Sequence, residues 1–226
     1  MLDMTRLGWK PVDILAKLDI LLDAIEQTRN KTPSNKSRLM TKISRWEEQI
    51  EQIKGDIEYV NHNLAPKLET MLSLKITNLE LLQVAMFQPS TKNLFLELET
   101  HYRSEGTNPL GNHGFADLIA LGEIAMVIAL LGDAAIAMGV LYQLWRPEPS
   151  DVGHLTQEKS EIVSNEHMAE VCDRWGLYEH RIHLDSEVPS RAEIEHDKGT
   201  LVEAIYGIIQ MEYGFGSVLD NVRHLL

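Results

Sequence analysis

The sequence predicts an all-α protein, and three observations support this fold class. Apolar residues recur at steps of three and four along most of the chain, which is the period of an amphipathic helix. No segment alternates apolar and polar residues as a half-buried strand does. Glycine or proline stands where each helical pattern stops, as at Pro33, Pro66, Gly176 and Gly214. We therefore expect helices joined by short loops.

Length and composition set limits on the class of protein. The chain has 226 residues, enough for one large domain or for one domain with an appendage, and 44% of them are hydrophobic. The single cysteine, Cys172, excludes an internal disulfide and a Cys-based zinc site. Together with an N-terminus that lacks a secretory pattern, this favours a cytoplasmic protein. Residues 124–144 are long enough to span a bilayer, but they include Asp133 and Gln143, so we expect no membrane span.

The charges are unevenly distributed along the chain. Residues 1–69 contain 11 basic and 11 acidic residues, whereas residues 70–226 contain 10 basic and 23 acidic ones and hold the whole net charge of −13. Lys and Arg are the residues that grip phosphate backbones. We therefore expect the acidic part to bind RNA poorly through bulk electrostatics. Such a surface can attract cations or simply keep the protein soluble.

Residues 1–67 are predicted to form an antiparallel coiled-coil helical hairpin. Two apolar seams, over residues 11–30 and 39–64, alternate steps of three and four, which is the coiled-coil period. A polar break that contains Pro33 separates them, and a short break of this kind joins antiparallel helices. Pro66 is expected to end the second helix. The hairpin either packs on the following domain or serves as an arm for a protein partner or for self-association.

Residues 68–226 are predicted to form the second unit, and their longest apolar run contains one isolated acid. Asp133 is the only charged residue between Glu123 and Arg146 in a run, residues 115–145, that we expect to be one helix. A carboxylate on a buried helix costs free energy unless it is paired, hydrogen-bonded or bound to a metal. Further helices are expected over residues 68–87, 156–164, 165–175 and from about 194 to 212.

Five blocks of this second unit, in order, resemble the catalytic domain of ribonuclease III. They are residues 78–90, the signature Leu131-Gly132-Asp133-Ala134-Ala135-Ile136 on a helix ending by Pro149, residues 153–166, residues 168–177 and residues 201–215. The resemblance implies a ribonuclease III-like all-α domain that cleaves structured or double-stranded RNA with Mg²⁺, or with Mn²⁺ as a substitute. Residues 91–124 are an insertion relative to the bacterial pattern. The hairpin is an addition, and the usual double-stranded-RNA-binding domain does not follow.

The resemblance assigns a role to two acids, Asp133 and Glu203. In the family, one helix carries Glu-x-x-Glu-x-x-x-Asp and a later helix carries Asp-x-x-Glu, spacings that place the acids on one face. Asp133 matches the signature Asp and Glu203 matches the later Glu, so both are predicted to be catalytic residues and metal ligands. The remaining family acids fall on Met126, Ala129, Thr200 and Val152. Replacement ligands could come from Glu123, Asp117, His196 or Asp151.

Two functions follow from this pattern. The first is RNA processing by metal-dependent endonucleolytic cleavage, impaired by the missing carboxylates. The alternative is a catalytically inactive dimer of the same fold that acts as a scaffold or as an RNA- or protein-binding partner. The resemblance also implies a homodimer that pairs through the helix of Asp133. Both functions depend on Asp133 and Glu203 meeting in space.

Overall fold

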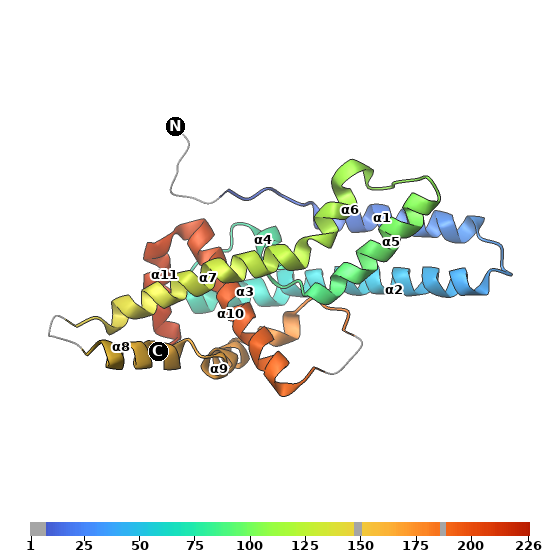
Figure 1. The fold of residues 1–226 in the computed structure, drawn as a ribbon. Helices are drawn as coiled ribbons and strands as arrows, with labels where there is room; N and C mark the ends of the chain where they lie inside the picture. Colours follow the sequence, from blue (N-terminus) through green and yellow to red (C-terminus); the bar gives the residue numbers. More distant parts are fainter. Residues whose placement is uncertain (1–7, 147–150, 186–188) are drawn as a thin grey trace.

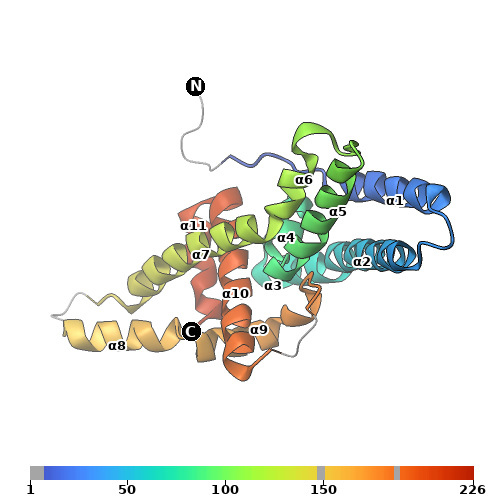
Figure 2. The same ribbon diagram turned by 45° about the vertical axis from the view of Figure 1, so that its right-hand side comes forward.

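The computed structural model describes residues 8–146, 151–185 and 189–226, and it is built of helices (Figures 1 and 2). Its α-helices are α1 (Ile14–Lys31), α2 (Ser37–Tyr59), α3 (Ala65–Leu72), α4 (Leu79–Ala85), α5 (Lys92–Ser104), α6 (Gly111–Ile119), α7 (Leu121–Leu144), α8 (Val152–Ile162), α9 (Asn165–Trp175), α10 (Arg191–Tyr213) and α11 (Phe215–Asn221). Within the described ranges there is no strand, only an isolated parallel bridge between Phe87 and Ile182. The all-α prediction is confirmed.

Helices α1 and α2 lie side by side and run in opposite directions, so the first third of the chain is a helical hairpin (Figures 1 and 2). The seam residues are fully buried, among them Leu18, Leu21 and Ile25 in α1 and Ile43 and Ile50 in α2. Because alternate steps of three and four put these side chains on one face, their burial explains why this sequence pairs the two helices. Supercoiling of the pair, and the division into units 1–67 and 68–226, stay predictions.

Pro66 does not end the second helix of the hairpin, contrary to the prediction. Helix α2 passes into a π-helical turn, Val60–Leu64, and then into α3, where Pro66 lies in the first turn. A proline inside an α-helix lacks an N–H and clashes with the carbonyl four residues earlier. The wider π turn just before it relieves this conflict. The result is a nearly continuous helical rod from Ser37 to Leu72.

Two helices that were predicted as single are each divided. The expected helix 68–87 is split because Ser73 adopts a left-handed φ of 53° and ends α3, after which Asn78 caps α4 by accepting the N–H of Leu81 at 3.1 Å. The apolar run 115–145 begins in α6 and turns at Ala120 before it continues as α7. Its predicted end at Pro149 lies outside the described residues.

The predicted insertion packs against the hairpin. Helix α5 contacts α2, where Lys42 Nζ lies 3.0 Å from the Glu97 carboxylate. On the α1 side, Lys17 Nζ lies 2.5 Å from Asp117 Oδ2 in α6. The insertion therefore packs on the hairpin, and both lie at the same end of the molecule (Figure 1).

At the other end, α10 runs between α7 and α9 and makes its most extensive contacts with these two helices. It begins with a capping box formed by Ser190 and Glu193, a device that satisfies free N–H groups of the first turn. It ends at Gly214, whose φ of 78° favours glycine. Tyr206 of α10 is fully buried and donates to the carbonyl of Asn221 at 2.7 Å, which anchors α11. This central position of α10 places its residues against the α7 segment around Asp133.

Candidate functional site

Helices α7 and α10 cross at two glycines, Gly132 and Gly207. A Cβ added to Gly132 would lie 1.7 Å from the carbonyl oxygen of Glu203, and a Cβ added to Gly207 would lie 2.1 Å from the carbonyl oxygen of Ile128. Side chains of any size would force the two backbones apart. The small residues therefore bring the backbones of the two helices into direct contact, and they fix where Asp133 and Glu203 meet.

Asp133 and Glu203 form a pair of carboxyl groups beside this crossing. Asp133 follows Gly132 directly, and the backbone of Glu203 is the group that Gly132 contacts. Partial burial, together with the nearby negative charge of Asp133 as the smaller cause, raises the pKa of the Glu203 carboxyl to about 7. The structure thus brings together the two acids that the sequence singled out.

The side chain of Asp133 is exposed, contrary to the buried setting expected for it. Its neighbours Leu130 and Ala134 are exposed as well, whereas Gly132 and Ala135 are buried against the protein. One face of α7 therefore has no covering helix among the described residues. The desolvation cost expected for an acid on this apolar helix falls instead on Glu203, which is half-buried on the opposing helix.

Three of the four positions where the family carries further acids lie on the two crossing helices, whereas Val152 begins α8. Ala129 is buried, with 2% of its surface exposed, whereas Met126 is 42% exposed. Met126 and Thr200 line the same cavity of about 200 Å³, together with Pro89 and His196. Neither Asp133 nor Glu203 belongs to the lining of this cavity. This recess thus has a thioether and a hydroxyl where the resemblance leads us to expect carboxylates.

Most of the residues that the sequence offered as replacement ligands bind other groups or lie away from the recess. Asp117 is engaged by Lys17, on the hairpin side of the molecule. Asp151 caps α8 by accepting the N–H of Gly153 at 2.9 Å, which is an ordinary structural role. Glu123 is exposed near the start of α7. Of these candidates, only His196 lies beside the recess, where its carbonyl accepts the Thr200 hydroxyl at 3.0 Å.

Asp197 is a residue of this recess that the sequence reasoning missed. It lines the cavity next to Thr200, and burial, with a further contribution from Asp185, raises the pKa of its carboxyl. The spacing could have revealed it, because Asp197 stands three residues before Thr200, and residues three apart lie on one face of a helix. An acid with a raised pKa in a recess is a common feature of functional sites.

The donor set does not complete a Mg²⁺ site. Within the described parts of the chain, no three side chains of His, Cys, Asp or Glu are grouped so that they could hold a metal ion. Mg²⁺ requires six oxygen ligands in octahedral array and is bound by carboxylates together with water and phosphate. A raised pKa also means that Glu203 binds a proton more readily than a free carboxyl does, which competes with any cation. The pair supplies two of the carboxylates that the resemblance leads us to expect.

The raised pKa of Glu203 has a consequence for stability. The folded state binds the Glu203 proton more tightly than the unfolded chain does, so the free energy of unfolding falls as the pH rises from about 4.5 to about 7. We expect Glu203→Gln to remove this loss and to stabilise the protein by about 1–2 kcal/mol at pH 8, a value reduced for solvent screening of a half-exposed group. At pH 4 the two proteins should be equally stable.

Urea unfolding between pH 4 and pH 8 measures this difference. Glu123→Gln, which neutralises an exposed acid on α7, is the matched control and should follow the pH dependence of the original chain. Identical pH profiles for Glu203→Gln and the unsubstituted protein would contradict the assignment of the raised pKa to this residue.

Comparison with known proteins relates the segment that contains α7 and α10 to a known family of proteins. Residues 127–214 match the family model described as the Ribonuclease III domain. A protein named Ribonuclease 3 from Flavobacterium psychrophilum is 33% identical over 89 residues, which cover 39% of this chain and 35% of that protein. The match thus spans about a third of the length of this relative. No solved structure matches the chain significantly.

The matched segment begins just before the crossing and ends at the glycine that closes α10, so it contains both Asp133 and Glu203. The similarity of residues 127–214 to the ribonuclease III domain agrees with the resemblance seen in the sequence. The hairpin and the whole insertion, residues 91–124, lie outside the match.

Proposed function

We propose that this chain is a ribonuclease III-like RNA-processing protein of the cytoplasm that binds structured or double-stranded RNA and has impaired endonucleolytic activity. The observation that carries the proposal is the α7–α10 crossing. It joins the signature acid Asp133 to Glu203, while Ala129 and Thr200 stand where the family places two further carboxylates. The crossing of the two helices is retained, but three of the five acids expected on them are replaced, by Met126, Ala129 and Thr200.

The chemistry of the pair supports impaired rather than ordinary cleavage. Hydrolysis of a phosphodiester needs a group that orients water and groups that offset charge on the phosphate. Both carboxyl groups can orient water, and Glu203 can exchange a proton near neutral pH, because its pKa of about 7 suits general acid–base work. They add negative charge, however, and Ala129 and Thr200 hold no cation near them. Loss of one such stabilising contact costs about 10²–10³-fold in rate.

Cleavage of a long RNA duplex under single-turnover conditions, with Mg²⁺ or Mn²⁺ in the buffer, tests the proposal. We expect slow cleavage by the unsubstituted protein and slower cleavage by Asp133→Asn and by Glu203→Gln. The double variant Ala129→Glu, Thr200→Asp restores two of the four missing family acids and should raise the rate by about 10²-fold or more.

The single variant Thr200→Asp is measured as well. A glutamate at the buried position of Ala129 disfavours folding, whereas Thr200 lines an open recess and tolerates an aspartate. Circular dichroism checks that each variant is folded. Cleavage that is unaffected by both Asp133→Asn and Glu203→Gln would overturn the role of the pair. Absence of cleavage in all variants, with RNA binding intact, would favour the second candidate function.

That second candidate is a catalytically silent dimer that acts as a scaffold, and the exposed face of α7 favours self-association. This α7 face is formed by Met126, Val127, Leu130, Met138, Leu141, Tyr142 and Trp145, all of which are exposed. Large contiguous apolar surfaces mark interaction sites. Helix α7 is also long and apolar enough to cross a membrane, although 44% of its most apolar window is buried inside the protein. We propose that the α7 face pairs with the same face of a second copy.

A further inference from the structure

The strongest unexplained charge feature lies at the tip of the hairpin, far from the carboxyl pair. Residues 27–46 contain six basic residues and no acidic residue, in a chain whose net charge is −13. They comprise the end of α1, the connecting loop and the start of α2, which project at one pole of the molecule (Figure 1). We call these six residues the basic tip: Arg29, Lys31, Lys36, Arg38, Lys42 and Arg45.

Half of the basic tip is neutralised by neighbouring acids and half is not. Arg29 pairs with Glu47, and both Lys42 and Arg45 pair with Glu97. The other three, Lys31, Lys36 and Arg38, are exposed, and no ion pair joins any of them to another of the described residues. Three adjacent free cations therefore remain at this pole.

Two of these cations lie where the dipole of their own helix disfavours positive charge. Lys36 is the N-cap of α2 and Arg38 lies in its first turn, where the helix dipole disfavours positive charge and favours anions. The first turn contains no acid, and no side chain caps it. Lys31 differs, because the last turn of α1 is a favourable place for a base. An anion at the start of α2 would satisfy Lys36, Arg38 and the free N–H groups of the first turn together.

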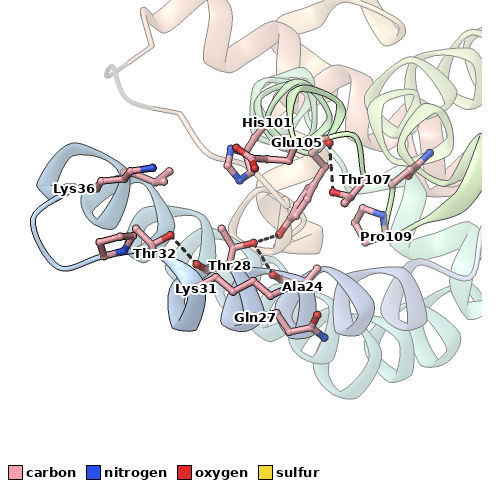
Figure 3. Close-up of a pocket in the computed structure, with 14 residues that line it drawn as sticks. Ala24, Gln27, Thr28, Lys31, Thr32, Lys36, His101, Glu105, Thr107 and Pro109 are labelled. Carbon is pink, nitrogen blue, oxygen red and sulfur yellow. Dashed lines mark hydrogen bonds between the residues drawn. The ribbon is translucent and has the colours of Figure 1, made fainter.

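A cavity of about 410 Å³ adjoins the basic tip and helps to define the ligand (Figure 3). Lys31 and Lys36 line one end of it. The hydroxyls of Thr28 and Thr32 also line it, but they already donate to backbone carbonyls at 2.9 and 2.7 Å. The lining also includes the Glu105 carboxylate and the Gln27 amide, so the positive charge is confined to the end formed by Lys31 and Lys36. Exposed positive charge at the edge of a cavity suits the sequence-independent binding of a phosphate backbone better than a specific small molecule.

We infer that the basic tip is a contact surface for the phosphate backbone of RNA. This inference rests on the proposed function, because it supplies an RNA-binding surface to a chain whose residues 70–226 carry the whole net negative charge. The acidic ribonuclease III domain repels phosphates at long range, so attraction must come from elsewhere. The three free cations of the basic tip are suited to provide it.

The basic tip acts on binding and not on the chemistry of the carboxyl pair. The helical rod from Ser37 to Leu72 separates the tip from the place where Leu68 and Leu72 adjoin Ile205 of α10. At 1.5 Å per residue this rod is roughly 50 Å long. The Debye length in physiological salt is only about 8 Å. Neutralising the tip therefore weakens RNA binding without any direct electrostatic effect on Glu203.

Binding of a fluorescent RNA duplex, measured by anisotropy over a series of KCl concentrations, tests the inference with the full chain. The test variant carries Lys31→Gln, Lys36→Gln and Arg38→Gln. The control variant carries Lys75→Gln, Arg191→Gln and Arg223→Gln, which remove the same number of exposed positive charges elsewhere. We expect the test variant to bind at least about tenfold more weakly at low salt. The slope of log affinity against log salt should fall by about 2 in magnitude, and the control should keep the original slope.

Three outcomes would overturn the inference. Equal loss in the test and control variants would show that only net charge matters. Unchanged RNA binding in both would leave the hairpin as an arm for a protein partner. Binding of the basic tip to vesicles that contain phosphatidylserine, with no binding to RNA, would identify a lipid surface instead. The proposed function can fail separately, because tip variants change RNA affinity whereas Asp133→Asn and Glu203→Gln change the cleavage rate of bound RNA.

Discussion

Gly132→Ala should remove most of the folding stability of this protein, by more than about 4 kcal/mol. The new Cβ would lie 1.7 Å from the carbonyl oxygen of Glu203, and the neighbouring backbone of Gly207 lies within 2.7 Å of the same point. Both obstacles are backbone, so no side-chain rotation can relieve the clash, and α7 and α10 must separate. Separation exposes core residues of both helices and disperses the carboxyl pair.

Thermal and urea unfolding measure this loss, and Gly55→Ala provides the matched control. Gly55 also lies inside a helix, α2, but nothing surrounds its Cβ position within 4 Å. There, alanine should stabilise the protein by about 0.5–1 kcal/mol, because glycine is a poor helix former. The same substitution should thus have opposite signs at the two sites. A Gly132→Ala protein as stable as the original would refute the close crossing of α7 and α10.

Val127→Lys combined with Leu130→Lys should convert the proposed dimer into a monomer, and this is the second large effect. The two side chains are 66% and 69% exposed in the isolated chain, so the substitution has little effect on the fold of one copy. In a twofold dimer each position counts twice. Each buried apolar side chain contributes about 1.5–3 kcal/mol, and buried lysines add a desolvation cost. The dissociation constant should therefore rise by at least about 1,000-fold.

Sedimentation equilibrium over a range of concentrations measures this change. The control variant Ile20→Lys, Leu96→Lys replaces exposed apolar residues of α1 and α5, which are 45% and 38% exposed. It should remain dimeric. A monomeric unsubstituted protein, or one that floats with neutral liposomes through α7, would contradict self-association through the α7 face.

Local sequence signals predicted the regular parts of the fold well. The helix Asn165–Trp175 was predicted with its observed bounds, because Ser164 caps its start and Gly176 takes a left-handed φ of 61° at its end. These are interactions between near neighbours, which a single sequence contains. The meeting of Asp133 and Glu203 was also predicted, from the resemblance to ribonuclease III. Composition alone would not have joined two residues that lie 70 positions apart.

The features that the sequence reasoning missed depend on contacts between distant segments. Pro66 reads as a helix end, and only the preceding π turn lets the rod continue. The turn at Ala120 contains neither glycine nor proline, so periodicity could not show that α6 and α7 are separate. The exposure of Asp133 was missed because α7 is apolar on nearly every face, and such a pattern does not show which face lacks a partner.

The pKa of the Glu203 carboxyl, measured by carbon-13 NMR titration, tests most directly whether the two acids share one site. We expect a value of about 7 in the unsubstituted protein. In Asp133→Asn the pKa should fall, because a negative neighbour is gone, but it should stay above 4.5, because burial is the larger cause of the shift. A Glu203 pKa near 4.5, or one that does not respond to Asp133→Asn, would show that the two carboxyl groups do not meet at the crossing of α7 and α10.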